Sequence, residues 1–260
     1  MRGKGLIFLM AGFMVAFEAL TGIAQVEKEK AQLYYVEDVL VKPSMVGEFE
    51  AAVREYVAQC ARYKFPYPSY VYNADDFHYY LAYPVENYAA IDSLHKAWGE
   101  LDTKMGAEQV QALNNRFEGT YEYFRHFVIR YMPELSYAPE KPRLKPEEEH
   151  FVYLDFYYFL PEMEKEEEQI GREWVELYKR KNIPYGYSLY AGVMGTDMPL
   201  YIMLLKAKSA ADYFSQSVKI RELLGEERKG LLKRTLDGTR KVEKKTGKFR
   251  PDLSYIPKDK

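Results

Sequence analysis

Two acidic residues occupy matching positions in two similar apolar segments. Glu37 follows Tyr35 by two positions in one segment, and Asp155 follows Tyr153 by two positions in another. Alternate side chains of an extended strand share a face, so each acid lies beside its tyrosine. A partly buried carboxyl group has a raised pKa and can act as a general base. The structural alternative is that each acid accepts hydrogen bonds from tyrosines and holds two sheets in register.

Two of the four histidines lie in segments that alternate as strands do. His78 shares a face with Tyr80, whereas His126 and its neighbour Arg125 face opposite ways. Imidazole changes charge near neutral pH, so a strand histidine can serve as an acid, a base, or a metal or haem ligand. A structural hydrogen-bond donor is the commoner role. No histidine follows His150, so chemistry that needs imidazole is confined to the first half of the chain.

These positions define the candidate site. The candidate catalytic residues are His126, His78 and Glu37, and the candidate ligand-binding residues are Tyr35, Tyr80, Asp155, Tyr153 and Arg125. We predict no metal site and no bound cofactor. The single cysteine, Cys60, lies in an apolar helical stripe and can form neither an internal disulfide nor a multi-cysteine zinc site. Motifs of the common hydrolases and nucleotide-binding proteins are absent from the sequence.

The two halves of the chain resemble each other. Residues 133–139 (PELSYAP) recur 118 positions later as residues 251–257 (PDLSYIP). Tyrosines recur at the same spacing in the pairs Tyr35/Tyr153, Tyr67/Tyr185, Tyr72/Tyr190 and Tyr137/Tyr255. Tyr80 and Tyr201 differ by 121 positions, which indicates three inserted residues in an intervening turn. The consistent order of these anchors predicts a tandem repeat.

Each unit has the predicted element order β-α-β-β-α-β. In the first unit we expect strands at 33–41, 69–73, 77–83 and within 121–131, and helices at 45–63, from about 87, and at 104–118. In the second unit we expect strands at 151–160, 186–191, 199–205 and 240–249, and helices at 162–181 and 210–236. The charged, proline-rich segment between the units predicts an extended, solvated linker.

The faces of the first strands differ in polarity. Even-numbered positions such as Val36, Leu40 and Phe156 are the more apolar ones, with Asp38 as an exception. We therefore expect the even-numbered face to pack on the helices. The same argument predicts that four residues point toward the opposite sheet: Tyr35, Glu37, Tyr153 and Asp155.

The passage Val36–Phe49 (VEDVLVKPSMVGEF) and the element order after it resemble the dimeric α/β-barrel superfamily, which includes antibiotic-biosynthesis monooxygenase-like, stress-responsive barrel and NIPSNAP-like domains. The resemblance covers residues 33–137 and 151–255. It implies an α+β fold in which two ferredoxin-like (βαββαβ) units pack their antiparallel sheets as an intramolecular dimeric α/β barrel, the tandem two-repeat form. It also implies a ligand pocket between a sheet and its helices or inside the barrel.

The resemblance also brings haem binding into consideration as a function. Two-repeat haem proteins of the family bind iron through a histidine of the second repeat. This sequence has no such histidine after His150, so a haem-binding barrel is a minor alternative.

The N-terminus has the features of an export signal. Two basic residues precede the uncharged apolar run Gly5–Phe17, which is shorter than the roughly 20 residues of a membrane span. Small residues at Gly22 and Ala24 predict cleavage after Ala24. We therefore expect a signal peptide at 1–24, a first repeat at 25–138, a linker at 139–150 and a second repeat at 151–260. The product would be periplasmic or extracellular; an uncleaved anchor is the alternative.

The charge balance bears on partners and function. With 37 basic and 39 acidic residues, the net charge of −2 argues against nucleic-acid binding. We expect no stable membrane insertion after signal cleavage and make no prediction of the oligomeric state. The basic C-terminal stretch would suit either the binding of anions or a solvated strand.

The leading hypothesis is an exported small-molecule-binding barrel protein, with cofactor-independent oxygenase or isomerase chemistry in the first repeat. The alternative is a non-catalytic envelope scaffold or interaction protein, which a filled interior would favour.

Overall fold

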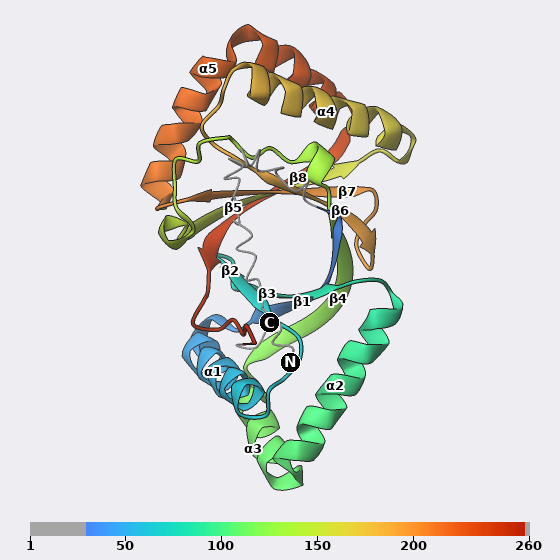
Figure 1. Cartoon of the computed structure of the whole chain (residues 1–260), viewed down its shortest axis with the longest axis vertical. Coiled ribbons are helices and arrows are strands. Elements are labelled where there is room, and N and C mark those ends of the chain that lie inside the picture. The colour runs from blue at the N-terminus through green and yellow to red at the C-terminus, as the bar shows by residue number, and fades with distance from the viewer. Residues whose placement is uncertain (1–29, 258–260) are drawn as a thin grey trace, which may run out of the picture.

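The chain forms a closed antiparallel barrel with helices packed outside it (Figure 1). The structure is a computed structural model that describes residues 30–257. The predicted signal peptide and its cleavage site lie outside the described residues. None of the helices in the described part of the chain is long and apolar enough to cross a membrane.

Within residues 30–257, the first half contributes four strands and three helices. These are β1 (Gln32–Val41), α1 (Val46–Arg62), β2 (Tyr70–Ala74), β3 (His78–Val85), α2 (Ala89–Met105), α3 (Ala107–Phe117) and β4 (Tyr121–Tyr131). In α1, Phe49, Val53 and Cys60 recur at helical spacing and are buried against the sheet. This periodicity explains why the segment forms an amphipathic helix.

The second half, again within the described residues, contributes four strands and two helices. These are β5 (Phe151–Phe159), α4 (Glu164–Arg180), β6 (Ser188–Met194), β7 (Leu200–Ala207), α5 (Ala210–Asp237) and β8 (Thr239–Phe249). The boundaries in both halves agree with the sequence-based expectations to within a few residues. Figure 1 shows α4 and α5 over one side of the barrel and α1, α2 and α3 over the other.

The strand order around the barrel is β1-β3-β2-β8-β5-β7-β6-β4. Each half contributes four adjacent strands, and the pairings β2–β8 and β4–β6 join the halves. All neighbouring pairs described are antiparallel, so β1 and β5, on opposite sides of the barrel, run in the same direction. Equivalent positions of the two halves therefore lie at the same end of the barrel.

In β1 and β5, each face of the strand points to the side opposite to the one expected from the sequence. Val36 and Phe156 line the barrel interior. Tyr35 is buried among the first-half helices, and Asp155 faces α4 and α5. The prediction that four side chains point toward the opposite sheet is wrong for Tyr35, Glu37, Tyr153 and Asp155. The reason is that two sheets facing each other need an apolar interior, which the even-numbered residues supply, whereas amphipathic tyrosines suit the layer beneath helices.

Equivalent residues of the two hairpins are one position further apart in the sequence than expected. Tyr79 lies opposite Val39, and Tyr201 lies opposite Tyr157, so Tyr79 is the counterpart of Tyr201. Tyr80 instead faces the barrel interior. The predicted equivalence of Tyr80 and Tyr201 is wrong, because a shift of one residue along a strand turns its side chain to the other face.

The repeated PELSYAP and PDLSYIP segments dock each half onto the other. After β4, Ser136 Oγ accepts a hydrogen bond from the backbone N–H of Leu189 in the second half, at 2.8 Å. After β8, Ser254 Oγ accepts one from the backbone N–H of Val71 in the first half, at 2.9 Å. The serines thus satisfy strand N–H groups of the opposite half.

The tyrosines of the same segments act alike. Tyr137 donates its hydroxyl hydrogen to the carbonyl of Ile183 at 2.9 Å, and Tyr255 donates to the carbonyl of Phe65 at 3.0 Å. Both tyrosine rings are buried. The recurrence of this motif therefore has a structural cause, the fastening of the halves in both directions.

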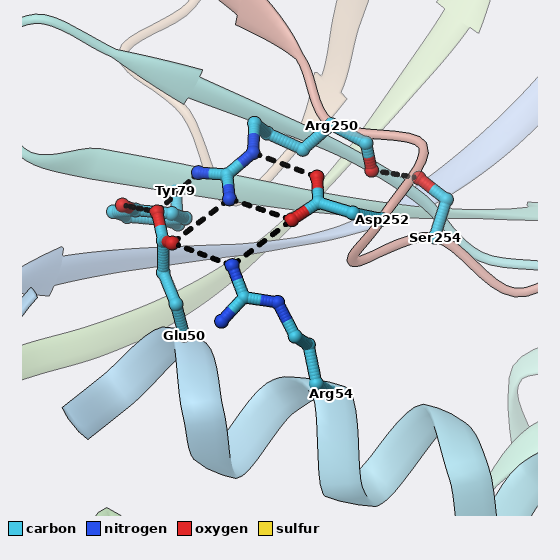
Figure 2. A network of polar contacts seen from close by, with 6 residues as sticks. All are labelled: Glu50, Arg54, Tyr79, Arg250, Asp252 and Ser254. Atoms are coloured by element: carbon cyan, nitrogen blue, oxygen red, sulfur yellow. Dashed lines mark hydrogen bonds and ion pairs between the residues drawn. The ribbon is translucent and has the colours of Figure 1, made fainter. Parts of the chain in front are cut away.

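A charged network fixes the C-terminal segment to α1 (Figure 2). Arg250 donates to both carboxylate oxygens of Glu50 and of Asp252. Arg54 bridges the same two acids at 3.0 and 3.1 Å, and Tyr79 donates to Glu50 at 2.7 Å. Mainly because of the hydrogen bonds from Arg250, the pKa of Glu50 falls to about 2.

The segment between the halves lies against the second half. Arg143 pairs with Asp212 at 2.5 Å, and Lys208 pairs with Glu148 at 2.6 Å. The predicted linker is therefore anchored rather than fully solvated. The domain boundaries placed on either side of it stay a prediction.

Candidate functional site

A cavity of about 650 Å³ lies between the second-half sheet and helices α4 and α5. The outward faces of β5, β7 and β8 form its floor. Over it α5 breaks at Gly225, whose φ of 62° glycine adopts without strain. The volume and the largely apolar, aromatic lining are typical of small-molecule sites.

The haem alternative can be tested against the side chains of this cavity. Its described lining contains no histidine, so it does not suit a histidine-ligated haem. Nor do residues 30–257 contain a group of three His, Cys, Asp or Glu side chains that could hold a metal ion.

Asp155 is the floor residue with the most unusual surroundings. The residue is 6% exposed, and its Oδ1 is buried without a hydrogen-bond partner among the described residues. Burial raises its pKa to about 6, although Lys244, opposite on β8, and Tyr157 both act to lower it. A carboxyl group with a pKa near neutrality can accept and release a proton at physiological pH.

Glu167 of α4 is the second acidic residue of the cavity. Its Oε1 is also buried and unpaired within the described chain. The same oxygen lies against Gly238, where a Cβ would collide with it. Burial raises the pKa of Glu167 to about 7, and the Glu166 charge adds to this rise. Asp155 Oδ1 and Glu167 Oε1 each therefore require a proton or a donor that residues 30–257 do not supply.

Aromatic rings line the same cavity as these two acids. Tyr153 stacks on Tyr213 of α5 with ring centroids 4.3 Å apart. Tyr178 meets Tyr187 edge-on at 5.2 Å. Burial raises the pKa of Tyr178 to about 12, so its hydroxyl stays protonated at neutral pH. Such walls favour a ligand with a planar ring.

The equivalent region of the first half is packed with aromatic side chains. Glu37 and His126 take the positions of Asp155 and Lys244, with Nε2 of the histidine 3.4 Å from Oε1 of the glutamate. The Tyr35 ring lies 5.0 Å from that of His126, centroid to centroid. The structure thus brings His126, Glu37 and Tyr35 together, and their catalytic and ligand-binding roles stay predictions.

The other candidate residues face the barrel interior. His78 Nδ1 lies 2.6 Å from Oδ1 of Asp38, and Arg125 Nε donates to Oδ2 of Asp38 at 2.9 Å. The Tyr80 ring stacks on that of His78, with centroids 5.8 Å apart. The predicted site residues therefore fall in three places: beneath the first-half helices (Tyr35, Glu37, His126), in the barrel (His78, Tyr80, Arg125) and in the second-half cavity (Tyr153, Asp155).

Two acidic residues of these sites are not predicted from the sequence. Asp38 interrupts an apolar face, and a charge at such a position is a signal of a buried partner. Glu167 belongs to an acidic run that the helix dipole explains. However, it precedes Ile170 and Trp174 by three and seven residues, which places it on the buried face of α4.

Most of the basic C-terminal stretch is strand β8, and two of its lysines are paired within the protein. Lys245 pairs with Asp76 at 2.7 Å, and Lys241 pairs with Glu243 at 2.5 Å. This stretch closes the barrel between β2 and β5, and whether its remaining basic residues bind anions stays open.

No protein-family model matches the sequence, and no curated protein is significantly similar to it. Among solved structures, an anthrone oxidase-like protein is similar with a TM-score of 0.60 and 11% identity, over 86% of this chain and 93% of that one. A candidate monooxygenase from Fusobacterium nucleatum has a TM-score of 0.53 and 12% identity, over 84% and 92%. Another from Lactobacillus acidophilus has a TM-score of 0.52 and 7% identity, over 88% and 97%. At these identities the likeness shows the fold, an α+β ferredoxin-like barrel, as expected.

Proposed function

We propose that the protein binds a small aromatic molecule with an acidic hydroxyl or methylene group in the second-half cavity, and that Asp155 accepts its proton. One observation carries this proposal: a buried carboxyl oxygen without a partner among the described residues lies in a cavity of about 650 Å³. The apolar, tyrosine-rich walls suit the ring. The unpaired oxygen suits the acidic group.

Proton transfer is the chemistry that these groups favour. With a pKa of about 6, Asp155 is ionised at pH 7 and remains basic enough to accept a proton. Lys244, directly opposite, would stabilise the anion left on the ligand. Glu167, with a pKa of about 7, offers a second place for a proton. Oxygenase or isomerase chemistry, expected in the first repeat, is thus proposed for the second.

Anthrone is a suitable probe, because one structural neighbour is an anthrone oxidase-like protein. It is an aromatic ketone with an acidic methylene group. Removal of a methylene proton leaves a carbanion that dioxygen can oxidise, so that anthrone and O₂ give anthraquinone and water. Binding can be measured without oxygen by quenching of tyrosine fluorescence, and turnover by anthraquinone absorbance after oxygen is admitted.

Three variants make the test specific. Met203→Trp fills the cavity floor and should abolish binding, whereas Lys104→Trp, on the exposed surface of α2, should bind as the wild type does. Asp155→Asn should retain binding within about tenfold and lose turnover by at least a hundredfold. Equal binding by the wild type and Met203→Trp would refute the proposed site.

We further propose that the two halves are tandem copies of one βαββαβ unit. Support comes from the equivalent strand registers and from Ser136 and Ser254, which make the same contact on opposite halves. We also propose export, with removal of residues 1–24. The mass of the protein isolated from its own host tests this, because a chain beginning at Gln25 is expected and a chain that retains Met1–Ala24 contradicts it.

A further inference from the structure

The barrel interior contains a second cavity, of about 240 Å³. Its walls come from both halves and are almost wholly apolar or aromatic, including Tyr34, Tyr72, Tyr80, Phe127, Phe156 and Tyr190. The volume is below the roughly 300–1,000 Å³ of pockets for drug-sized ligands. The cavity therefore suits a ring or a short chain.

A charged layer adjoins this cavity at the end of the barrel where β1 and β5 finish. Asp38, next to Val36 on the inward face of β1, is 1% exposed, and both its carboxylate oxygens are held, one by His78 and one by Arg125. An ionised carboxylate accepts hydrogen bonds, so His78 donates through Nδ1. Burial of an ion is costly without such partners, and here both are present.

The second half lacks this layer. At the positions equivalent to Asp38 and His78 it has Phe156 and Leu200, and opposite Phe156 on β8 it has Glu243 where the first half has Arg125. On that side the charged group is a different one, Glu243, which pairs with Lys241 and accepts a hydrogen bond from Tyr158. The layer is a property of the first half, and the fold does not require it.

Arg125 is held in place and still has free donors. Only its Nε bonds to Asp38, and its terminal nitrogens have no hydrogen-bond partner in residues 30–257. The side chain is 59% exposed, and the guanidinium lies 5.5 Å from the centre of the Tyr123 ring. Burial raises the pKa of both Tyr80 and Tyr158, and the Arg125 charge opposes this rise in both. Of these two tyrosines, Tyr80 lines the cavity, so the Arg125 charge acts on one hydroxyl of its wall.

A second cation lies at the same junction. Lys245 Nζ lies 5.7 Å from the ring centre of Tyr80 and 6.0 Å from that of Phe156, two residues of the cavity wall. Its side chain is 13% exposed and pairs with Asp76. Both cations are thus paired with an acid, and Arg125 is the one of the two whose terminal nitrogens lack a partner within residues 30–257.

We propose that the barrel interior binds a small monocarboxylate, with its carboxylate on the terminal nitrogens of Arg125 and its apolar ring or chain in the cavity that Tyr80 and Phe156 line. A guanidinium matches a carboxylate with two parallel hydrogen bonds, and the contacts with Asp38 and Tyr123 pre-orient it. The apolar walls favour a carboxylate with a hydrocarbon part over a bare inorganic anion. This site is separate from the cavity beneath α4 and α5.

Calorimetric titration with benzoate and hexanoate tests the proposal, with benzamide and hexan-1-ol as uncharged counterparts. The wild type should bind a carboxylate at least tenfold more tightly than its uncharged counterpart. Arg125→Gln should weaken carboxylate binding at least tenfold, and Arg125→Lys should lie between the two. Arg130→Gln, at an exposed and outward-facing position of the same strand, should bind normally.

Cavity-filling variants locate the ligand independently of the charge. Ala82→Phe fills the barrel interior and should abolish benzoate binding, whereas Met203→Trp should not affect it. Unchanged binding in both Arg125→Gln and Ala82→Phe would overturn the proposal, as would no binding of either carboxylate by the wild type. Loss of benzoate binding in Met203→Trp alone would also overturn it, and would leave the function proposed for the second-half cavity intact.

Discussion

Asp155 lies directly opposite Lys244 across the β5–β8 pairing, and yet its Oδ1 stays buried and without a partner among the described residues. The first half has Glu37 and His126 at the same two positions, 3.4 Å apart in a layer of packed aromatic rings. The same two positions thus belong to a packed aromatic layer in the first half, and they place a polar group in a cavity in the second half.

The buried Asp155 carboxyl should make folding stability depend on pH. Its pKa rises from 3.8 in the unfolded chain to about 6 in the folded protein, so the unfolded state ionises first as pH rises. Its contribution is therefore most favourable below pH 4, declines between pH 4 and 6, and is level above pH 6. We expect Asp155→Asn to be more stable than the wild type at pH 8, by up to about 3 kcal/mol, and similar at pH 4.

Urea unfolding of both proteins from pH 4 to 8 measures this difference. The difference isolates Asp155, because Glu167 titrates in both proteins. A constant difference across the range would contradict the raised pKa.

The serines that dock the halves should be of equal importance. Ser136→Ala and Ser254→Ala each leave a partly buried strand N–H without its acceptor, and each should cost about 1–3 kcal/mol. Ser93→Ala, at an exposed position of α2, is the control and should change stability by less than about 0.5 kcal/mol. If both docking variants unfold at the same urea concentration as the control, these hydrogen bonds do not fasten the halves.

The network of Figure 2 should matter most between pH 2 and 5. The pKa of Glu50 is lowered from 4.5 to about 2, so its stabilising contribution is complete above pH 5 and is lost as pH falls toward 2. Arg250→Gln should reduce stability at pH 7 by about 1–2 kcal/mol, a modest amount because the network is partly open to water, which screens its charges. Its effect should shrink on acidification, which urea unfolding at pH 3 and 7 can show; an equal loss at both values would exclude the electrostatic explanation.

The element order is predictable because strand alternation and helical periodicity are local. Phe49, Val53 and Cys60 mark the buried face of α1 by their spacing alone. The facing of the strands is not local, because both faces of β1 and β5 are largely buried. The polarity of the two faces then predicts the wrong orientation. Asp38, the one charge on the more apolar face of β1, lies in the barrel interior with the rest of that face.

The site is less predictable than the fold for a related reason. Histidines attract attention because of their pKa, but the larger cavity lies in the second half, and its lining contains no histidine. Asp155 can be selected from its strand position. Its unpaired oxygen, and the approach of Glu167 to Gly238, depend on how α4 and α5 pack, which no local pattern encodes.

A crystal structure with anthrone bound is the most direct test of the central claim. The account predicts electron density for one molecule in the cavity beneath α4 and α5, with its methylene or oxygen atom in contact with Asp155 and its rings beside Tyr153 and Tyr213. Crystals of Met203→Trp grown under the same conditions should show none there. Electron density for anthrone only at another position, or an empty cavity at saturating anthrone in the wild type, would contradict the account.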